Sequence, residues 1–133
     1  MLALASHGPC FICGPENPEG LGLTFFQDVA GNRVVADLTI PLKCQGPPGF
    51  AHGGLLAAVL DEAMGKAAWL AGHRAYAAHL EFDYRKPVPV GAAARFVAWV
   101  DRSEGRKAFT LCVVKLGDVV AVEGKGLFVS VRE

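Results

Sequence analysis

The sequence predicts a single α+β domain, residues 1–133, in which one curved antiparallel β-sheet wraps around one long central helix. Three observations lead to this prediction. The length of 133 residues is enough for one hydrophobic core but not for two. Residues 53–71 form the one long segment with helical character, and it lies early in the chain. Segments of strand character follow one another around it with short turns, which favours antiparallel neighbours.

The residues before the helix predict an irregular segment followed by a pair of strands. Residues 1–19 contain Gly-Pro and Asn-Pro pairs, which mark turns. The elements expected next are strands at 20–28 and 33–40, joined by Ala30-Gly31-Asn32, and a loop over 41–49. The helix over 53–71 then begins directly after a loop rich in glycine and proline.

Four more strands are expected after the helix, at residues 75–85, 92–101, 106–116 and 118–131. The first of them has a clean two-residue alternation, because side chains of a strand point to opposite faces. One predicted face carries Tyr76, Ala78, Leu80, Phe82 and Tyr84, and the other carries His79, Glu81, Asp83 and Arg85. Sequential hairpins of this kind, with one helix to cover one face, complete the predicted architecture.

The charge balance excludes several classes of protein. Lysine plus arginine number 13 and aspartate plus glutamate number 13, whereas a nucleic-acid binder of this size would be basic. No apolar stretch of 18 residues is free of charge, so we expect no membrane span. The N-terminus lacks the basic region of a signal peptide. We therefore expect a cytoplasmic protein that binds neither nucleic acid nor membrane, with its cysteines reduced.

The apolar content predicts a self-associating chain. Hydrophobic residues make up 52% of the sequence and 16 glycines come in addition, which exceeds the roughly 45–50% of ordinary soluble domains. Surplus apolar surface on a small body suggests cover by another subunit. The long strand 75–85 could pair across a two-fold axis as an exposed edge. We expect a homodimer or a homotetramer.

The helix carries a stripe of small residues interrupted by one acid. At steps of three and four residues, this stripe contains Gly54, Ala58, Asp61, Gly65, Ala68 and Gly72. Asp61 therefore lies on a face suited to close approach by a ligand or by another backbone, or else at the solvent edge of tight helix–sheet packing. The adjacent Glu62 stands four residues before Lys66, which predicts an exposed ion pair.

The start of the helix has the features of an anion site. It contains His52, Gly53 and Gly54, and glycines let a backbone come close to a ligand. The first amides of a helix have no intrahelical partner and can bind an oxyanion. An electrophilic helix end and the carboxylate of Asp61 on one helix form a constellation suited to acyl transfer.

Two clusters in the sequence contain residues of the types that bind metals. The pair Cys10 and Cys13 is half of a zinc knuckle, which needs two more ligands. Cys44 with one of His7, His52 or His73 could complete it, but there is no second Cys-x-x-Cys, and two buried thiols in a turn are the simpler interpretation. The residues His79, Glu81 and Asp83 are interpreted as a solvated or interface face. We expect no metal.

The stretch GPPGFAHGGLLAAVLDEAMG resembles the signature of the hotdog-fold thioesterases, especially the PaaI-like branch. The likeness consists of His52-Gly53-Gly54 followed, after six residues, by Asp61. The CFICGPENPEGLGL opening, the YRKPV segment and the EGKGLFVSV ending are also similar to this branch, so the resemblance covers nearly the whole chain.

This resemblance implies a hotdog fold, assembled as dimers or tetramers with active sites at the subunit interface. It implies that Asp61 is general base or nucleophile, that the Gly53 amide polarises the thioester carbonyl, and that His52 shapes the site. Several relatives carry an amide side chain where this chain has Gly46, with Gln45 one step earlier as a possible replacement. Some carry a hydroxyl roughly where Ala77 stands.

The function expected from this resemblance is hydrolysis of an acyl-CoA, with an aryl, short or medium acyl chain, to a carboxylic acid and coenzyme A. Coenzyme A is part of the substrate, and no cofactor is expected. Arg or Lys near the pocket mouth would bind its phosphates. The substrate-binding candidates are Gly54, Gln45, Phe50, Arg85, Lys86, Arg102, Arg106 and Lys107.

Two other functions are compatible with a hotdog fold. The absence of polar side chains at Gly46 and Ala77 motivates a non-catalytic acyl-CoA-binding sensor of the same fold. A hotdog hydratase acting on enoyl-CoA would need an aspartate and a histidine close together on a motif that this sequence lacks. Free-thiol release from acyl-CoA substrates separates the thioesterase from the sensor.

Overall fold

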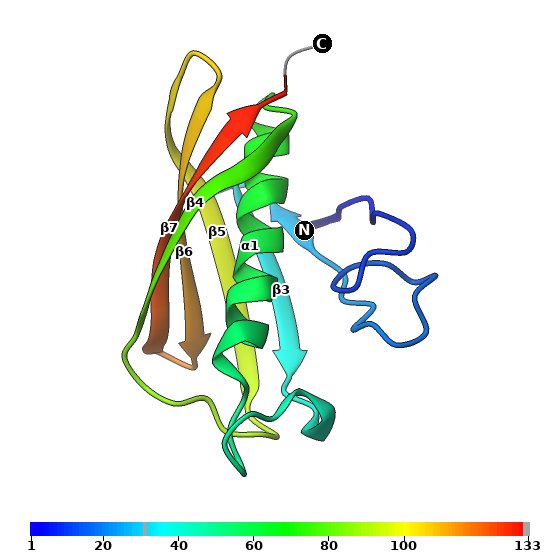
Figure 1. The fold of residues 1–133 in the computed structure, drawn as a ribbon. Helices are drawn as coiled ribbons and strands as arrows, with labels where there is room; N and C mark the ends of the chain where they lie inside the picture. Colours follow the sequence, from blue (N-terminus) through cyan, green and yellow to red (C-terminus); the bar gives the residue numbers. More distant parts are fainter. Residues whose placement is uncertain (31, 132–133) are drawn as a thin grey trace.

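The computed structural model describes residues 1–30 and 32–131, and in them one α-helix lies against one seven-stranded antiparallel sheet (Figure 1). The predicted α+β architecture is confirmed. In chain order the elements are β1 (Leu2–Ala3), β2 (Phe26–Asp28), β3 (Arg33–Thr39), a 3₁₀ turn (Leu42–Cys44), α1 (Gly53–Leu70), β4 (Ala75–Tyr84), β5 (Ala93–Glu104), β6 (Lys107–Leu116) and β7 (Val119–Ser130).

The strand that follows the helix lies at an edge of the sheet. The spatial order is β1-β2-β3-β5-β6-β7-β4, so β4 pairs with β7, the last strand of the chain. Their register runs from Ala75 opposite Ser130 to Tyr84 opposite Val122. Within the described chain, β4 has a hydrogen-bonded neighbour on one side only. An edge strand of ten residues is a surface on which a second chain can pair.

The predicted alternation of β4 is interrupted near its start. The register with β7 shifts between Ala77 and His79, which is the mark of a β-bulge. Beyond the bulge Leu80 and Phe82 pack against the core, whereas Tyr76 is 75% exposed. The five residues predicted to share one face therefore do not share one environment.

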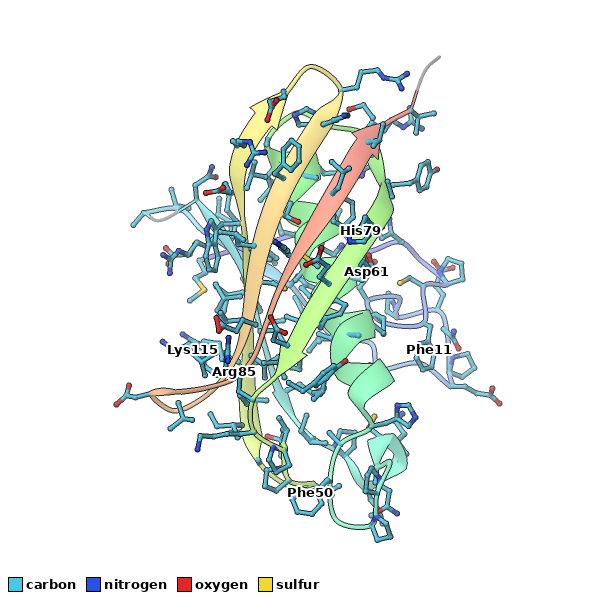
Figure 2. All side chains as sticks on the ribbon, turned by 60° about the vertical axis from the view of Figure 1, so that its left-hand side comes forward. Phe11, Phe50, Asp61, His79, Arg85 and Lys115 are labelled. Carbon is cyan, nitrogen blue, oxygen red and sulfur yellow. The ribbon has the colours of Figure 1, made fainter. Side chains whose placement is uncertain are left out.

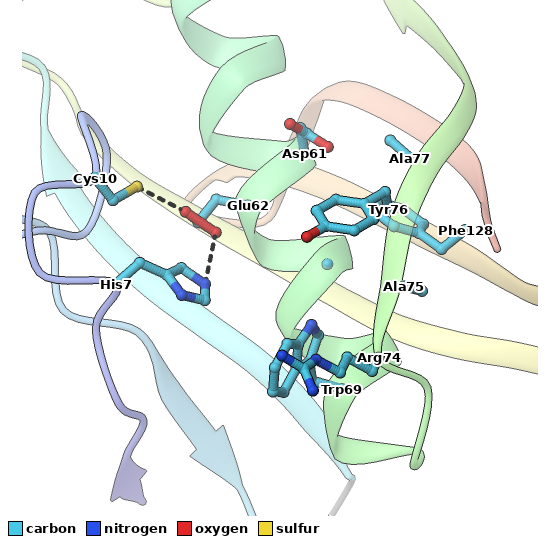
Figure 3. A pocket seen from close by; sticks show the side chains of 11 residues that line it. His7, Cys10, Asp61, Glu62, Trp69, Arg74, Ala75, Tyr76, Ala77 and Phe128 are labelled. Carbon is cyan, nitrogen blue, oxygen red and sulfur yellow. Dashed lines mark hydrogen bonds and ion pairs between the residues drawn. The ribbon is translucent and has the colours of Figure 1, made fainter. Parts of the chain in front are cut away.

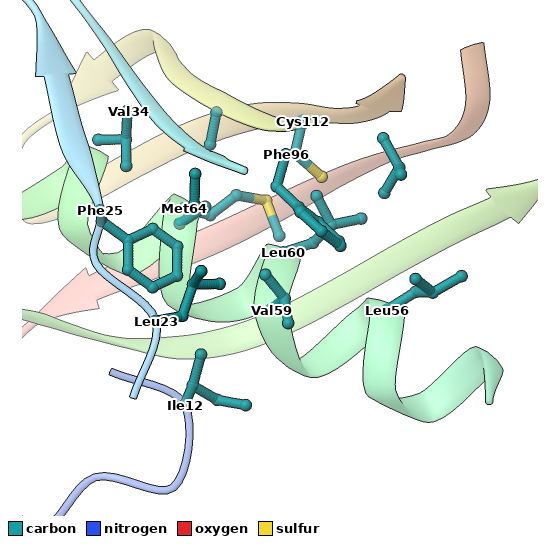
Figure 4. Close-up of a cluster of buried hydrophobic side chains, with 14 of the residues drawn as sticks. Ile12, Leu23, Phe25, Val34, Leu56, Val59, Leu60, Met64, Phe96 and Cys112 are labelled. Carbon is teal, nitrogen blue, oxygen red and sulfur yellow. The ribbon is translucent and has the colours of Figure 1, made fainter. Parts of the chain in front are cut away.

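The core lies between α1 and the concave face of the sheet (Figure 4). The helix contributes Leu56, Val59, Leu60, Ala63, Met64 and Ala67, all buried. Phe96 of β5 packs in the same cluster and is fully buried. Burial of each large apolar side chain contributes about 1.5–3 kcal/mol. The same helix is not a membrane span, since no helix among the described residues is long and apolar enough to cross a bilayer.

The N-terminal segment differs most from prediction. The strand expected at 20–28 is limited to Phe26–Asp28, and β1 was not predicted. The amides of Leu21 and Leu23 instead donate to the carbonyls of Phe11 and Ile12, so this part of the chain pairs with the irregular segment before it. Of the predicted turn, Gly31 lies outside the described residues.

The N-terminal segment is anchored along the outer side of α1. Leu23 and Phe25 are buried in the core, although neither lies in a strand. Lys66 of the helix is buried, and its Nζ donates to the carbonyl of Ala5 at 2.8 Å. That ammonium also lies 5.5 Å from the centre of the Phe25 ring. The segment therefore forms one wall of the space beside the helix.

Candidate active site

Asp61 lies in the third turn of α1 and lines a pocket of about 440 Å³ (Figure 3). Gly65, one turn further along the helix, lines the same pocket, and a Cβ there would reach Phe128 of β7 at 3.5 Å. The small-residue stripe thus leaves space beside the carboxylate. The other lining residues are His7, Cys10, Glu62, Trp69, Arg74, Ala75, Tyr76, Ala77 and Phe128.

The environment of Asp61 makes its carboxylate a stronger base. Burial raises the pKa of Asp61 above the usual range for aspartate, and the neighbouring Glu62 carboxylate raises it further. A carboxylate of raised pKa accepts a proton more readily, which is what a general base at neutral pH requires. The perturbed group also lies in a pocket, the combination typical of functional sites.

Glu62 points away from Asp61, toward the N-terminal segment (Figure 3). The Cys10 thiol donates to its carboxylate at 3.0 Å, and the Cys13 thiol lies 3.6 Å from the same oxygen. The Nε2 atom of His7 is 3.7 Å from the other oxygen. The predicted exposed pair with Lys66 is wrong, because the Glu62 side chain is only 15% exposed and Lys66 is buried against Ala5.

His52 is the N-cap of the helix. Its Nδ1 accepts a hydrogen bond from the Gly54 amide at 2.9 Å, and its own amide donates to the Cys44 carbonyl. The Gly54 amide is therefore occupied by the cap, which removes it as the donor to a substrate. The amide of Gly53, the first residue of the helix, has no intrahelical partner by its position.

Tyr84 fixes the same end of the helix to strand β4. Its hydroxyl donates to the Gly53 carbonyl at 2.7 Å, and burial raises the pKa of Tyr84, which keeps the proton on that oxygen. The sequence did not identify Tyr84 as a site residue. Its position at the end of the strand, on the face with Leu80 and Phe82, was the available signal.

The Gly53 amide and the Asp61 carboxylate do not meet within one chain. They are eight positions apart, which corresponds to about 12 Å along a helix that rises 1.5 Å per residue. One thioester carbonyl cannot contact both groups across that distance. The two groups that the sequence placed in one site are thus about two turns apart on one helix, Gly53 at its start and Asp61 near its middle.

The loop before the helix holds the other predicted residues close to His52. The side-chain oxygen of Gln45 accepts from the Gly49 amide at 3.2 Å, so it stabilises its own loop. A Cβ on Gly46 would lie 2.9 Å from the Cα of His52, so only glycine fits there. The Phe50 side chain is 39% exposed at the same end of the molecule.

The predicted basic residues form two separate groups. Arg85 pairs with Glu123 next to Lys86, at the end of the sheet where the helix begins (Figure 2). Arg102, Arg106 and Lys107 belong to the opposite hairpin, where Arg102 pairs with Glu104 and lies over the Phe109 ring. The register of β7 places the two groups about seven residues, or roughly 23 Å, apart. One chain does not combine them into one phosphate site.

The metal ligands considered from the sequence are not assembled as expected. Cys44 lies beside His52 at the start of the helix, whereas Cys10 and Cys13 lie beside Glu62. His73 is held between the hydroxyls of Ser103 and Ser130. On the outer face of β4, His79 and Glu81 are exposed and hydrogen-bonded to each other at 3.0 Å.

A single long helix enclosed by one curved antiparallel sheet is the hotdog fold. The sequence model of the thioesterase superfamily matches residues 48–125, which include the start of the helix, Asp61 and strands β4 to β6. The chain belongs to the thioesterase superfamily.

Individual relatives agree with this assignment. The human acyl-coenzyme A thioesterase THEM5 is 34% identical over 137 residues, a match that covers 98% of this chain and 56% of that protein. A solved thioesterase superfamily protein superimposes with a TM-score of 0.86 and 29% identity over 92% of this chain and 61% of its own. The chain spans about half the length of the curated relatives it matches.

The PaaI protein of Escherichia coli, from the phenylacetic acid degradation operon, shares the fold. Its TM-score is 0.75 at 17% identity, and the match covers 84% of this chain and 81% of that one. The predicted PaaI-like hotdog architecture is thereby confirmed.

Proposed function

We propose that this chain is an acyl-CoA thioesterase, which hydrolyses the thioester of an acyl-CoA to a carboxylic acid and free coenzyme A. The observation that carries the proposal is the half-buried Asp61 carboxylate, held with raised pKa in a pocket of a thioesterase-superfamily fold. The relatives named acyl-coenzyme A thioesterase support the choice of substrate class.

The active site is composed of two chains. Asp61 shares its pocket with Ala75, Tyr76 and Ala77, at the start of β4, whereas Gly53 is bonded to Tyr84 at the end of the same strand. Antiparallel pairing of β4 with the β4 of a second copy places the start of one strand beside the end of the other. The Asp61 pocket of one subunit then faces the Gly53 amide of its partner.

This pairing supports a homodimer, alone or as the unit of a homotetramer. It covers the open edge of β4 and the exposed aromatic side chains of Trp69 and Tyr76. Burial of an apolar edge of this kind stabilises association, and the antiparallel two-fold arrangement is the commonest symmetry of soluble oligomers.

In the proposed reaction, the partner's Gly53 amide donates a hydrogen bond to the thioester carbonyl oxygen. Asp61 takes a proton from a water molecule whose oxygen attacks the carbonyl carbon, or its own oxygen attacks directly. The oxyanion formed is stabilised by that amide and by the positive end of the helix dipole. Collapse breaks the carbon–sulfur bond, and the coenzyme A thiolate takes up a proton. If Asp61 has attacked directly, the acyl group is left on its carboxylate as an anhydride, which a water molecule then hydrolyses to release the acid and restore the carboxylate.

The reaction uses no cofactor, because the leaving thiol already belongs to the substrate. The acyl group occupies the Asp61 pocket, whose wall includes Trp69, Tyr76 and Phe128 and therefore suits an aryl, short or medium acyl chain. The coenzyme A phosphates are bound by basic residues at the two ends of the sheet, which dimerisation brings nearer to one another. We place the reaction in the cytoplasm.

A panel of aryl-, short- and medium-chain acyl-CoA substrates tests the activity, with free thiol as the product detected. We expect turnover by the native chain and its loss in Asp61→Asn. Absence of turnover on every substrate, with measurable acyl-CoA binding, would instead support a sensor. That second function is favoured by Ala77, since no hydroxyl at this position in the pocket wall orients a water.

Mixed dimers test the two-chain site. Equal amounts of Asp61→Asn and Gly53→Pro chains, unfolded and refolded together, give about half hybrid dimers by random pairing, and each hybrid has one intact site. We expect about a quarter of native activity in the mixture, although each variant alone is inactive. An inactive mixture that contains hybrids would show that both groups act within one chain.

A further inference from the structure

A second cluster of reactive side chains lies where the N-terminal segment meets α1, beside the Asp61 pocket. Three of its members, His7, Cys10 and Cys13, come from the irregular N-terminal segment, and Glu62 comes from the helix (Figure 3). One ligand atom from each of His7, Cys13 and Glu62 lies within 4.8 Å of the others. The Cys10 thiol lies 3.0 Å from the same carboxylate. The proposed hydrolysis uses none of these four groups.

The spacing of these atoms is close to that of a tetrahedral zinc site. Zinc bonds of about 2.0–2.3 Å place neighbouring ligand atoms about 3.3–3.8 Å apart. Here the carboxylate oxygens of Glu62 lie 3.0 Å from the Cys10 sulfur, 3.6 Å from the Cys13 sulfur and 3.7 Å from the His7 Nε2. Three of the four residues, His7, Cys13 and Glu62, already have their ligand atoms within 4.8 Å of one another, and the Cys10 thiol has to move closer to them to complete the set.

The backbone around the two sulfurs has the arrangement that metal-bound thiolates require. The amides of Ile12 and Cys13 both donate to the Cys10 sulfur at 3.4 Å, and the His7 amide donates to the Cys13 sulfur at 3.4 Å. Donors of this kind fix ligand orientation and offset the charge of a thiolate. These three amide donors are a second observation, separate from the distances between the ligand atoms, because the path of the main chain sets their positions.

The choice of cation follows from the donor set. Two thiolates, one imidazole and one carboxylate suit a borderline-soft divalent ion that accepts tetrahedral geometry, which is zinc rather than magnesium or calcium. Four protein ligands leave no open position for water, so a site of this kind stabilises structure and does no chemistry.

We propose that His7, Cys10, Cys13 and Glu62 form a structural zinc site that fastens the N-terminal segment to α1, one residue from Asp61. This proposal departs from the sequence analysis, which expected no metal and considered a ligand set that included Cys44 but not Glu62. Because His7 and Cys10 also line the Asp61 pocket, the ion holds one wall of that pocket in place.

Zinc binding to the reduced, metal-stripped full chain tests the proposal. We expect about one zinc ion per chain by elemental analysis, and an affinity that falls in Cys13→Ser by more than the roughly 10–100-fold caused by loss of an outer-shell partner. Cys44→Ser is the matched control, since Cys44 is also a buried thiol but lies at the other end of the helix, and it should bind as the native chain does.

Cobalt(II) provides a second measurement that needs no variant. We expect the visible bands of a tetrahedral site together with thiolate-to-cobalt charge-transfer absorption in the native chain. The proposal is overturned by a reduced native chain that takes up no zinc, by cobalt binding without thiolate absorption, or by equal zinc affinity in Cys13→Ser and the native chain. A loss in Cys44→Ser as large as in Cys13→Ser overturns it as well.

Discussion

Replacing Gly53 by proline removes the proposed oxyanion donor with little change to the fold. Proline lacks the backbone N–H but is well tolerated at the first position of a helix, which Gly53 occupies. The residue before a proline must have extended backbone, and His52 already has φ −65° and ψ 130°. The carbonyl that accepts from Tyr84 is retained. The change therefore deletes one hydrogen-bond donor.

The expected loss is that of a single donor to a developing oxyanion. Removal of one such group lowers kcat by about 10²–10³, or roughly 2.7–4 kcal/mol of transition-state stabilisation. The Gly54 amide cannot compensate, because it is bound to His52 at 2.9 Å. The substrate is still bound by its acyl chain and phosphates, so we expect the effect on kcat to exceed that on KM.

Steady-state hydrolysis of an acyl-CoA, followed by thiol release, measures the effect, with thermal unfolding as the check on folding. Gly53→Ala is the matched control: it keeps the N–H, and its Cβ would lie 3.5 Å from the Tyr84 ring, an ordinary contact. We expect it to retain activity within about threefold, as for a substitution that removes no interaction. Equal activity of the proline and alanine variants would refute the role of the amide.

Three further predictions concern Asp61 and Glu62 of the helix and Gly124 of strand β7. Asp61→Asn should lower turnover at least about a hundredfold. It should also make the fold more stable than the native chain above the pKa of Asp61. The reason is that a carboxyl whose pKa is raised in the folded state contributes stability at low pH, and this contribution is lost as the pH rises through that pKa. Denaturant unfolding of both proteins from acid to neutral pH measures this, and a constant difference would contradict it. Glu62→Gln should change turnover by less than about tenfold, since the Glu62 carboxylate points away from Asp61 and accepts from the Cys10 thiol. An inactive Glu62→Gln beside an active Asp61→Asn would reverse the assignment. Gly124→Ala should lower the free energy of unfolding by about 1–3 kcal/mol, because the added Cβ would lie 2.8 Å from the Glu81 carbonyl oxygen. Denaturant unfolding measures this, and an unchanged midpoint would contradict the contact.

The helix and the strands after it could be predicted because their signals are local. The small residues and the apolar residues of 53–71 form separate stripes, and the strands 92–101, 106–116 and 118–131 are bounded by turn residues. In the structure these segments differ from prediction by at most three residues at either end. The separation of Asp61 from Glu62 also follows from helix geometry alone, since adjacent residues point about 100° apart.

The partners of Glu62 could not be predicted in the same way. Local spacing favoured Lys66, four residues away, but the N-terminal segment folds over this face and buries both side chains. The contacts that replace the pair join residues 49 to 61 positions apart, such as Cys13 with Glu62 and Ala5 with Lys66. The same long-range packing accompanies the bonds of Leu21 and Leu23 to the loop at Phe11 and Ile12, which take the place of the predicted strand.

Strand β4 also determines how the rate depends on the amount of enzyme. The Asp61 pocket lies at one end of this strand and Gly53 at the other. In the proposed two-chain site, an isolated chain therefore holds two half-sites that cannot act together. Above the dissociation constant of the proposed dimer, the rate is proportional to protein concentration. Below it, the number of complete sites falls with the square of concentration, so turnover per chain declines on dilution and recovers when protein is added.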